Sequence, residues 1–194
     1  MRAVAGAIVA CVWQDARMRV DAVTGLLVGV KQVLSPFFDA RPSVQPDLVV
    51  LHGISLPPGE FGGPWIARLF TGSLPAEAHP EFRDRAALRV SAHVLIRRDG
   101  EPVQFVSLND RAWHAGRSSW QGREACNDYS IGIECEGADD IPYEDAQYGT
   151  LRLLLPMLAA AYPGITRERI VGHSDVAPGR KTDPGPSFDW ARIA

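Results

Sequence analysis

The stretch DLVVLHGIS, Asp47–Ser55, decides the fold of this chain. Four apolar residues follow one another without interruption, and the segment then ends in polar residues before a Pro-Pro-Gly turn signal. A continuous apolar run that is bounded in this way is typical of a buried strand that feeds a loop. We therefore expect a central strand here, with His52 just past its most buried part.

The segments that follow add a helix and a pair of strands around this one. The spacing of apolar residues predicts a short helix over 64–70. Residues 90–97 alternate between two sets of side chains, and a second extended segment, 102–108, follows an Asp-Gly turn. This pattern predicts a β-hairpin.

The C-terminal part predicts a further strand and a long helix. Residues 129–136 alternate, so that apolar side chains face one way and polar or small ones the other. Helical spacing predicts a helix over 144–162, in which Pro156 should produce a kink or a break. A short helix, 166–169, then leads to an apolar step at 170–171. Strands and helices in this order predict a single α/β domain, with a central mixed β-sheet flanked by helices.

Length and composition bound the class of protein. The chain has 194 residues, 46% of them hydrophobic, which suits one globular domain. A net charge of −3 provides no basic field, so we expect no nucleic-acid partner. No segment is apolar over enough residues to span a bilayer, so we expect no membrane partner. The three cysteines favour a reducing compartment over a disulfide framework, although Cys126 and Cys135 can still pair.

The N-terminus carries an ambiguous apolar run. Residues 3–13 resemble the front of a signal peptide, but 14–17 form a poor cleavage region and Met18 follows at once. We therefore expect residues 1–17 to be a non-native or misannotated extension, with Met18 as the true first residue and 18–194 as the functional domain. An exported protein is the alternative.

Three reactive side chains stand where predicted strands end. His52 follows the central strand, His173 follows the second apolar step, and Asp183 lies ten residues further on. Two imidazoles and one carboxylate form a sound catalytic zinc set, because three protein ligands leave a fourth position for water. Such an ion lowers the pKa of that water and polarises a carbonyl. Spacing alone leaves the site open, since all three residues can equally be hydrogen-bonded structural residues.

Two further residues are candidates for catalysis. Glu134 lies on the polar face of its strand beside Gly132, which we expect to leave open space above the sheet. A carboxylate there can take a proton from water and pass it to a leaving amine. Lys181 precedes Asp183 by two residues, so its ammonium can reach an oxyanion at the same site. The alternatives are a solvated strand face for Glu134, which Glu136 shares, and an exposed loop lysine for Lys181.

Weaker candidates surround these residues. The AWHAG stretch, 112–116, suits a cleft floor that a ligand approaches closely, but a packed turn would look the same. His93, on a predicted strand, is as readily a satisfied core histidine. Arginine pairs bidentately with carboxylates, although most arginines are surface residues. The candidate anchors are Arg89, Arg97 and Arg123, and the substrate contacts that we expect are Arg89, Trp113, His114 and Ala115.

Six motifs together resemble a known family. They are SPFFDARP at 35–42, LHGISLPPGEFGG at 51–63, SAHVLIRRDG at 91–100, RAWHAG at 111–116, IGIECEG at 131–137 and GHSDVAPGRKTDPGPSFDW at 172–190. From about residue 20 to its end, the chain resembles the zinc-dependent N-acetylmuramoyl-L-alanine amidases related to peptidoglycan recognition proteins. Within them it is most similar to the AmpD-type amidases, which remove the peptide from 1,6-anhydro-N-acetylmuramic acid in cell-wall recycling.

The resemblance implies a role for each of the main candidates. It assigns zinc ligation to His52, His173 and Asp183, the general base to Glu134, and the oxyanion-stabilising cation to Lys181. It also implies an α/β fold with the zinc cleft on one face of the mixed sheet.

The implied activity is hydrolysis of the amide between the lactyl group of the anhydro-sugar and L-alanine, by a monomer in the cytoplasm that takes an anhydro-muropeptide. Two alternatives stay open: an exported amidase that acts on intact peptidoglycan, and a non-catalytic muropeptide-binding module. Several positions depart from the family pattern without removing a ligand or catalytic group. Gly53 stands where relatives often carry Asn, and Ser174 and Asp175 vary after the second histidine. Ala125 stands where some relatives carry Arg, which puts one substrate anchor in doubt.

Overall fold

The computed structural model describes residues 18–42 and 44–193, so the expectation for residues 1–17 concerns a segment outside the described part. At its centre is a six-stranded sheet made of β3 (Lys31–Gln32), β5 (Leu48–Ile54), β6 (Val94–Ile96), β7 (Pro102–Gln104), β11 (Ser130–Glu136) and β12 (Ile170–Gly172). The spatial order is β12-β5-β11-β6-β7-β3. The first four strands run parallel, β6 and β7 pair antiparallel, and β7 and β3 pair parallel. The expected mixed sheet is confirmed.

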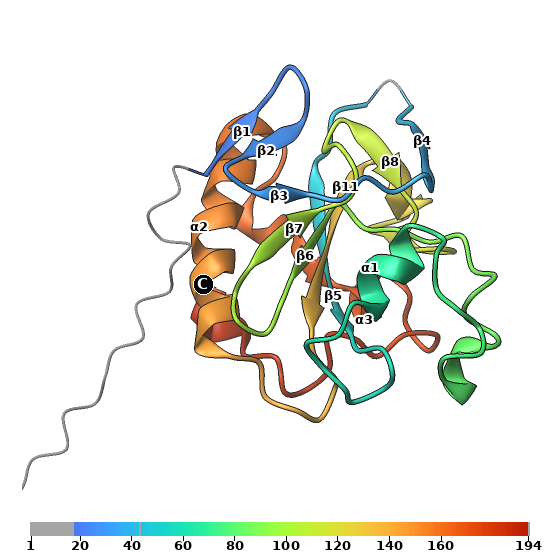
Figure 1. Cartoon of the computed structure of the whole chain (residues 1–194). Helices are drawn as coiled ribbons and strands as arrows, with labels where there is room; N and C mark the ends of the chain where they lie inside the picture. The colour runs from blue at the N-terminus through green and yellow to red at the C-terminus, as the bar shows by residue number, and fades with distance from the viewer. Residues whose placement is uncertain (1–17, 43, 194) are drawn as a thin grey trace, which may run out of the picture.

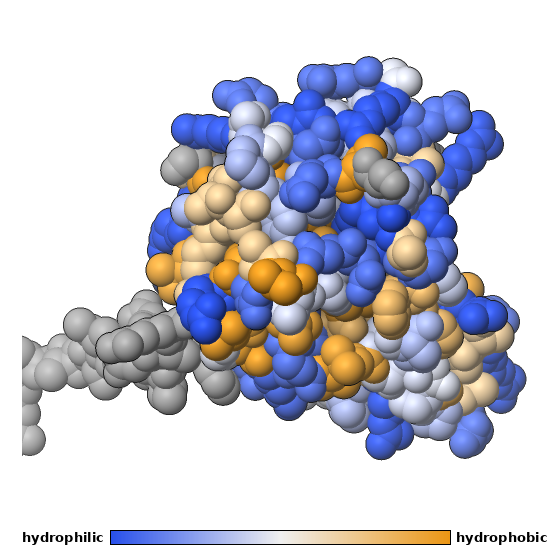
Figure 2. All heavy atoms as spheres, turned by 90° about the horizontal axis from the view of Figure 1, so that it is seen from above, coloured by the Kyte–Doolittle hydropathy of each residue, from blue (hydrophilic) through white to orange (hydrophobic). Residues whose placement is uncertain are grey.

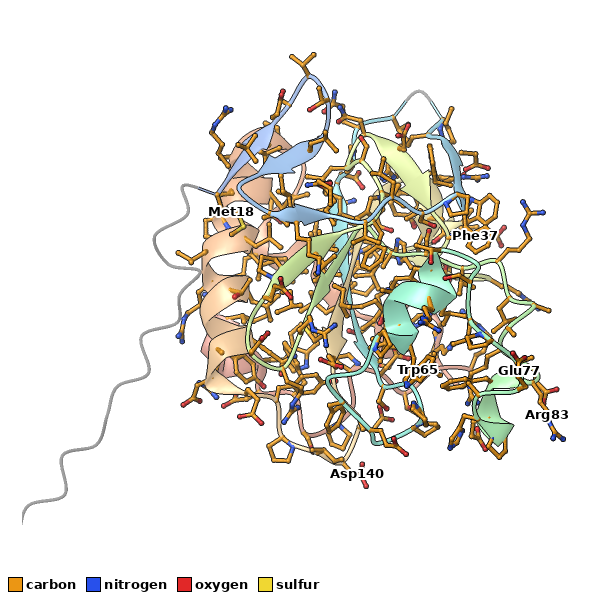
Figure 3. The ribbon with its side chains drawn as sticks, in the orientation of Figure 1. Met18, Phe37, Trp65, Glu77, Arg83 and Asp140 are labelled. Carbon is orange, nitrogen blue, oxygen red and sulfur yellow. The ribbon has the colours of Figure 1, made fainter. Side chains whose placement is uncertain are left out.

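Helices cover both faces of this sheet. The long helix α2 (Asp145–Ala161) lies along one face, and α1 (Trp65–Phe70) and the one-turn helix α3 (His173–Val176) lie on the other (Figure 1). Phe37 and Trp65 accordingly appear on the side of the molecule away from α2 (Figure 3). The helices match the expected 64–70 and 144–162 within a residue or two at each end.

The smaller elements surround this core. Three two-stranded antiparallel sheets consist of β1 (Arg19–Asp21) with β2 (Leu26–Val28), β4 (Phe38–Ala40) with β8 (Asp110–Ala112), and β9 (Ser119–Trp120) with β10 (Arg123–Glu124). Single turns of 3₁₀ helix are η2 (Pro80–Phe82), η3 (Cys126–Asp128), η4 (Arg167–Arg169) and η5 (Trp190–Ile193).

The period of two along the central strands decides what each face carries. On β11, Ile131 and Ile133 belong to the apolar cluster that packs against α2. Because neighbours along a strand point to opposite faces, Gly132 and Glu134 face the side of α3. The same alternation turns His52 of β5 to that side. One face of the sheet is therefore an apolar core, and the other carries polar groups at its centre.

The expected hairpin is present, but its strands are shorter than predicted. β6 and β7 have three residues each. Just before β6, the N–H of Ser91 donates to the carbonyl of Trp113, and the N–H of His93 donates to that of Gly132. The backbone therefore leaves the regular ladder here and ties together two segments that border the polar face.

The long helix runs unbroken through Pro156, so of the two outcomes expected there, a kink or a break, the break does not occur. Proline removes the N–H that would donate to the carbonyl four residues earlier, that of Arg152. Both residues are exposed, so solvent can hydrate the freed carbonyl. The buried stripe of the helix includes Tyr148, Leu151 and Leu158, and it holds the helix against the sheet.

The surface and the cysteines give three further facts. Cys126 and Cys135 are buried free thiols and do not pair. Within residues 18–42 and 44–193, no helix combines the length and the apolarity that a bilayer crossing requires. Hydrophilic residues cover much of the face seen from above, with apolar residues in groups between them (Figure 2).

Leu151→Ala should destabilise the protein strongly. Leu151 is fully buried between α2 and the sheet, so its truncation loses apolar burial and leaves a cavity, at a cost of about 2–5 kcal/mol. Leu153 on the same helix is 49% exposed, and Leu153→Ala should change the free energy of unfolding by less than about 0.5 kcal/mol. Urea denaturation of both variants measures the difference, and equal effects would refute this packing.

Candidate metal centre

Two neighbouring parallel strands bring two histidines together. His52 lies inside β5, so the expectation that it follows the strand is wrong by a few residues. His173 comes directly after β12 and begins α3. Since Gly172 pairs with Leu51 in the β12–β5 register, the next residue on each strand is one of the two histidines. Their Nδ1 atoms lie 2.9 Å apart.

Asp183 joins this pair from a loop that follows α3. Its Oδ2 lies 3.0 Å from Nδ1 of His173 and 3.2 Å from Nδ1 of His52. The loop is held in two places: the N–H of Ser174 donates to the carbonyl of Asp183, and the hydroxyl of Tyr143 donates to the carbonyl of Pro184. The carboxylate therefore sits in a defined place opposite both imidazoles.

The three donor atoms fit a metal ion. In a tetrahedral site with bonds of about 2.0–2.1 Å, ligand atoms are separated by roughly 3.3 Å. The observed separations of 2.9, 3.0 and 3.2 Å are close to that value. Two ring nitrogens that face each other share at most one proton in a hydrogen bond, so a cation satisfies the trio better than protons do. His52, His173 and Asp183 thus form a possible metal site.

The protonation states also suit a cation. Burial lowers the pKa of His52 to about 4, although its hydrogen bond with Asp183 opposes the shift. Burial alone would raise the pKa of Asp183, but hydrogen bonds with His173 and His52 outweigh burial and hold it well below its usual range. At neutral pH the site therefore presents a neutral His52 ring and a carboxylate, the forms that bind metals.

Glu134 lies beside the trio on the neighbouring strand. It is the register partner of His52 in the β11–β5 pair, and it is only 8% exposed. Burial raises the pKa of Glu134 well above its ordinary value, and the negative charge of Asp183 adds to the shift. Glu134 therefore does not lie on a solvated strand face. Glu136 is buried too, but its carboxylate accepts backbone N–H groups from Gly62 and Arg98 and so ties two loops together.

The three candidate ligands and Glu134 border one cavity of about 210 Å³, which Lys181 also lines. Lys181 is exposed, and its positive charge acts in the direction that lowers the pKa of both Glu134 and His52. A cation, a raised-pKa carboxylate and a metal-ligand trio thus share a single small space.

Gly132 does not leave open space above the sheet, so that expectation is wrong. A Cβ atom at this position would lie 2.4 Å from Cγ of His114. The imidazole of His114 occupies the space, with Nδ1 2.9 Å from Nε2 of His52 and Nε2 3.2 Å from the hydroxyl of Ser130. The glycine is needed because the ring packs directly on the strand.

Of the remaining expected contacts, Trp113 lines the cavity, whereas Arg89 and Ala115 are chain neighbours of residues that line it. Trp113 stacks on Phe37 with ring centres 6.3 Å apart, and the exposed guanidinium of Arg89 lies 5.7 Å from each ring. Ala115 contributes its backbone: its carbonyl lies 3.2 Å from Nε2 of His173 and accepts a hydrogen bond from Arg180.

The other candidates serve the fold. His93 is a satisfied core histidine: its Nδ1 accepts the N–H of Gly132, and its Nε2 lies 3.1 Å from the carbonyl of Asp110. Arg123 forms an ion pair with Asp47 at 2.6 Å. The guanidinium of Arg97 reaches the carbonyl of Gly63 and the carboxylate of Glu101.

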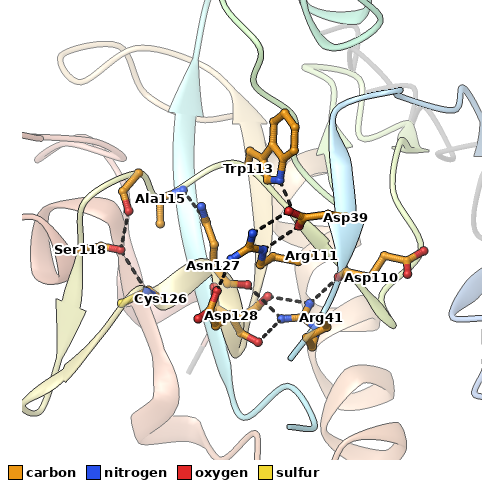
Figure 4. Close-up of polar contacts among 12 residues, drawn as sticks. Asp39, Arg41, Asp110, Arg111, Trp113, Ala115, Ser118, Cys126, Asn127 and Asp128 are labelled. Carbon is orange, nitrogen blue, oxygen red and sulfur yellow. Dashed lines mark hydrogen bonds and ion pairs between the residues drawn. The ribbon is translucent and has the colours of Figure 1, made fainter. Parts of the chain in front are cut away.

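A polar network that the sequence did not point to supports the cavity floor (Figure 4). Asn127 accepts the backbone N–H groups of His114 and Ala115 at 3.3 and 2.8 Å. Arg111 bridges the carboxylates of Asp39 and Asp128, each at 2.6 Å. Asp39 and Arg111 lie in quoted motifs, but their partners are separated by up to 72 residues, so no local signal identifies the pairs.

Gly53 and Ala125, which depart from the family pattern, have distinct surroundings. A Cβ atom on Gly53 would lie 2.3 Å from the hydroxyl of Tyr143, so any side chain there requires Tyr143 to move. Ala125 has a positive φ of 57° and borders a second cavity of about 680 Å³. Arg180 borders that cavity as well and joins it to the floor of the first through its bond to Ala115.

The chain is similar in sequence to known amidases. The family described as N-acetylmuramoyl-L-alanine amidase matches residues 42–186. The 1,6-anhydro-N-acetylmuramyl-L-alanine amidase AmpD of Escherichia coli (strain K12) is 60% identical over 170 residues, which cover 87% of this chain and 92% of the relative.

Solved structures are similar in fold as well. A crystal structure of an Se-Met AmpD derivative has a TM-score of 0.87 and 58% identity, and the match covers 91% of this chain and 97% of that one. The amidase AmiD from E. coli, in complex with the substrate anhydro-N-acetylmuramic acid-L-Ala-D-gamma-Glu-L-Lys, has a TM-score of 0.53 and 31% identity over 78% of this chain and 58% of that one.

Glu134→Gln should stabilise the metal-free protein more and more as the pH rises. Burial raises the pKa of Glu134, so the folded state binds this proton more tightly than the unfolded chain, whose value is near 4.5. The resulting stability is present below the unfolded pKa and is lost as the pH rises toward the folded one. The loss is about 1.4 kcal/mol for each unit of upward shift, and glutamine does not incur it.

Urea titrations of both proteins between about pH 4 and pH 8 measure the effect. The gap between wild type and variant should widen toward high pH. A gap that stays constant over this range would show that Glu134 is not held in a desolvated place.

Proposed function

Because the chain belongs to the N-acetylmuramoyl-L-alanine amidase family, we propose that it hydrolyses the amide between the lactyl group of 1,6-anhydro-N-acetylmuramic acid and L-alanine in muropeptides. It does so as a zinc-dependent enzyme of peptidoglycan recycling. The observation that carries the proposal is the convergence of two imidazoles, one ionised carboxylate and one raised-pKa carboxylate on a single cavity.

His52, His173 and Asp183 would hold the ion through their facing Nδ1, Nδ1 and Oδ2 atoms. Two nitrogens and one oxygen suit zinc better than magnesium or calcium, which take sites made of oxygen atoms. When bound, zinc polarises a substrate carbonyl and makes water more acidic.

Glu134 acts first as general base and then as general acid. Its pKa is raised by burial and by Asp183, so its carboxylate is a stronger base than an exposed glutamate. It takes a proton from the attacking water at a carboxylate oxygen. It then gives that proton to the nitrogen of the departing L-alanine, which would otherwise leave as a poor amide anion.

Lys181 stabilises the charge that develops on the carbonyl oxygen. It borders the same cavity as Glu134 and the ligand trio, and its ammonium is solvated until a substrate arrives. A fixed positive charge near the developing oxyanion lowers the barrier most in a site from which substrate has displaced water.

Substrate contacts are assigned to the rim and floor of the cavity. Arg89, held over Phe37 and Trp113, offers a guanidinium to a substrate carboxylate. The ring of Trp113 offers an apolar surface to the sugar, and His114 and Ala115 form the floor. Named relatives act on the same type of compound: E. coli AmpD is a 1,6-anhydro-N-acetylmuramyl-L-alanine amidase.

We further propose that the protein acts as a monomer in the cytoplasm. The free thiols of Cys126 and Cys135 fit a reducing compartment. Anhydro-muropeptides are small, and the cavity that receives the scissile bond, at about 210 Å³, is small as well.

The test compares purified anhydro-muropeptides with polymeric sacculi, each with and without a chelator. We expect release of the stem peptide from anhydro-muropeptides, loss of that release with chelator, its recovery when zinc is returned, and far slower attack on sacculi. Equal attack on both substrates would favour an exported amidase of intact peptidoglycan. Muropeptide binding without cleavage in the zinc-loaded protein would favour a binding module.

Asp183→Ala and Glu134→Gln should fail in different ways. Asp183→Ala removes a ligand, so the purified protein should contain little zinc. Glu134→Gln should keep zinc and lose about 10²–10⁴-fold in kcat, the usual contribution of a positioned general base. Glu136→Gln is the control on the same strand, since Glu136 holds Gly62 and Arg98 rather than facing the reaction. It should keep most of its turnover.

Zinc content by atomic absorption and kcat on an anhydro-muropeptide give the two readouts. A Glu134→Gln protein with wild-type kcat would remove Glu134 from the mechanism. Full zinc content in Asp183→Ala would remove Asp183 from the ligand set.

A further inference from the structure

His52 has two ring nitrogens, and both have partners. Nδ1 faces His173 and Asp183 at 2.9 and 3.2 Å. Nε2 lies 2.9 Å from Nδ1 of His114. A neutral imidazole carries one proton, so only one of its nitrogens can present a lone pair to a cation. When Nδ1 binds the ion, the group at Nε2 must therefore accept a proton.

When Nδ1 of His52 is a metal ligand, one assignment of protons satisfies the whole chain of contacts. If Nδ1 of His52 presents a lone pair to the ion, its Nε2 carries the proton and donates it to Nδ1 of His114. His114 then carries its own proton on Nε2, from which it donates to the hydroxyl of Ser130 at 3.2 Å. Exchanging the tautomer of His114 would set two N–H groups against each other at 2.9 Å.

His173 reaches the same tautomer by simpler means. Its Nε2 lies 3.2 Å from the backbone carbonyl of Ala115. A carbonyl only accepts hydrogen bonds, so it keeps the proton on Nε2 without help. His52 lacks such a fixed acceptor and depends on a side chain, which a substitution can remove.

Strand β11 is shaped to hold this side chain. Ser130, Gly132 and Glu134 are successive residues on one face of the strand. The hydroxyl of Ser130 contacts the ring of His114. Gly132 leaves the space that this ring fills, and Glu134 is the candidate base. The backbone N–H of His114 donates to the side-chain oxygen of Asn127. The orientation of the ring is therefore determined by several independent contacts.

We propose that His114 is a positioning residue of the metal centre: held by Ser130 and by the gap at Gly132, it accepts the Nε2 proton of His52 when Nδ1 binds the ion. The inference rests on the proposed zinc site and deepens it. Outer contacts of this kind usually involve a carboxylate, a carbonyl or water and typically change metal affinity by about 10–100-fold. Here the outer contact is a neutral imidazole, which is itself hydrogen-bonded to a serine.

Two substitutions at one position separate hydrogen bonding from packing. In His114→Asn, the side-chain oxygen takes the place of Nδ1 and can still accept from His52. In His114→Leu, similar volume remains but no acceptor does. We expect zinc affinity, measured by competition with a chromophoric chelator, to fall about 10–100-fold in His114→Leu and to stay near the wild-type value in His114→Asn. Gly132→Ala, which displaces the ring, should resemble His114→Leu.

A second readout does not need turnover. In the zinc-loaded protein, ¹⁵N spectra of the imidazoles should show the Nε2 proton of His52 in a hydrogen bond in the wild type and in His114→Asn, and without that hydrogen bond in His114→Leu. His79→Leu, which removes a histidine remote from the cavity, is the control and should change neither readout.

Three results would overturn the inference. They are wild-type zinc affinity in His114→Leu, equal losses in the Asn and Leu variants, and a zinc-loaded wild type in which Nε2 of His52 makes no hydrogen bond. The first result together with lost turnover would leave His114 as a substrate contact alone. Failure of the wild-type protein to bind zinc would refute the proposed function, whereas unchanged zinc affinity in His114→Leu would refute only the role of His114.

Discussion

Parallel pairing of β5 with β12 on one side and β11 on the other is the constraint on which the candidate centre depends. The β5–β11 register sets His52 against Glu134, and the β5–β12 register delivers His173 next to His52. A slip of one residue would turn His52 or Glu134 to the face of α2. That face is filled by an apolar cluster of strand and helix residues, so a slip would bury a charge in the core. The hydrophobic packing of α2 thereby fixes the geometry of a polar site on the opposite face.

Most of the buried polar atoms that His93 and Arg41 bring to the polar face are hydrogen-bonded, with Nε of Arg41 as an exception. His93, fully buried beneath the cavity, accepts one backbone N–H and reaches one carbonyl. Arg41 has its pKa lowered to about 10 by burial, and its guanidinium donates to the carbonyls of Asn127, Asp128 and Ser130. Unpaired, such groups would each cost several kcal/mol. Because they are hydrogen-bonded, these side chains connect the segments that surround the strand ends and so hold the site in place.

Loops supply what the strands cannot. Asp183 and Lys181 come from an irregular segment, which is anchored by the bond from Tyr143 to the carbonyl of Pro184. The cavity floor at 113–115 is likewise held by Asn127 and by the ion pairs of Arg111. Rigid strands thus place two histidines and the base, while tied loops bring the third ligand and the cation to them.

The sequence by itself determined the buried central strand, the alternation of 129–136, the stripe of the long helix and the residue types of the candidate centre. These depend on local periodicity and on the chemistry of side chains, which are written in order along the chain. Only the tertiary structure decided that the ring of His114 fills the space above Gly132, and that α2 continues through Pro156. It also decided that the carboxylate of Glu136 binds the backbone of two loops. Each of these depends on neighbours that are distant in sequence or on which face meets solvent. Contacts between His52 and His114, 62 residues apart, exist only once the sheet has formed, because the ring of His114 packs over Gly132 of β11, beside β5.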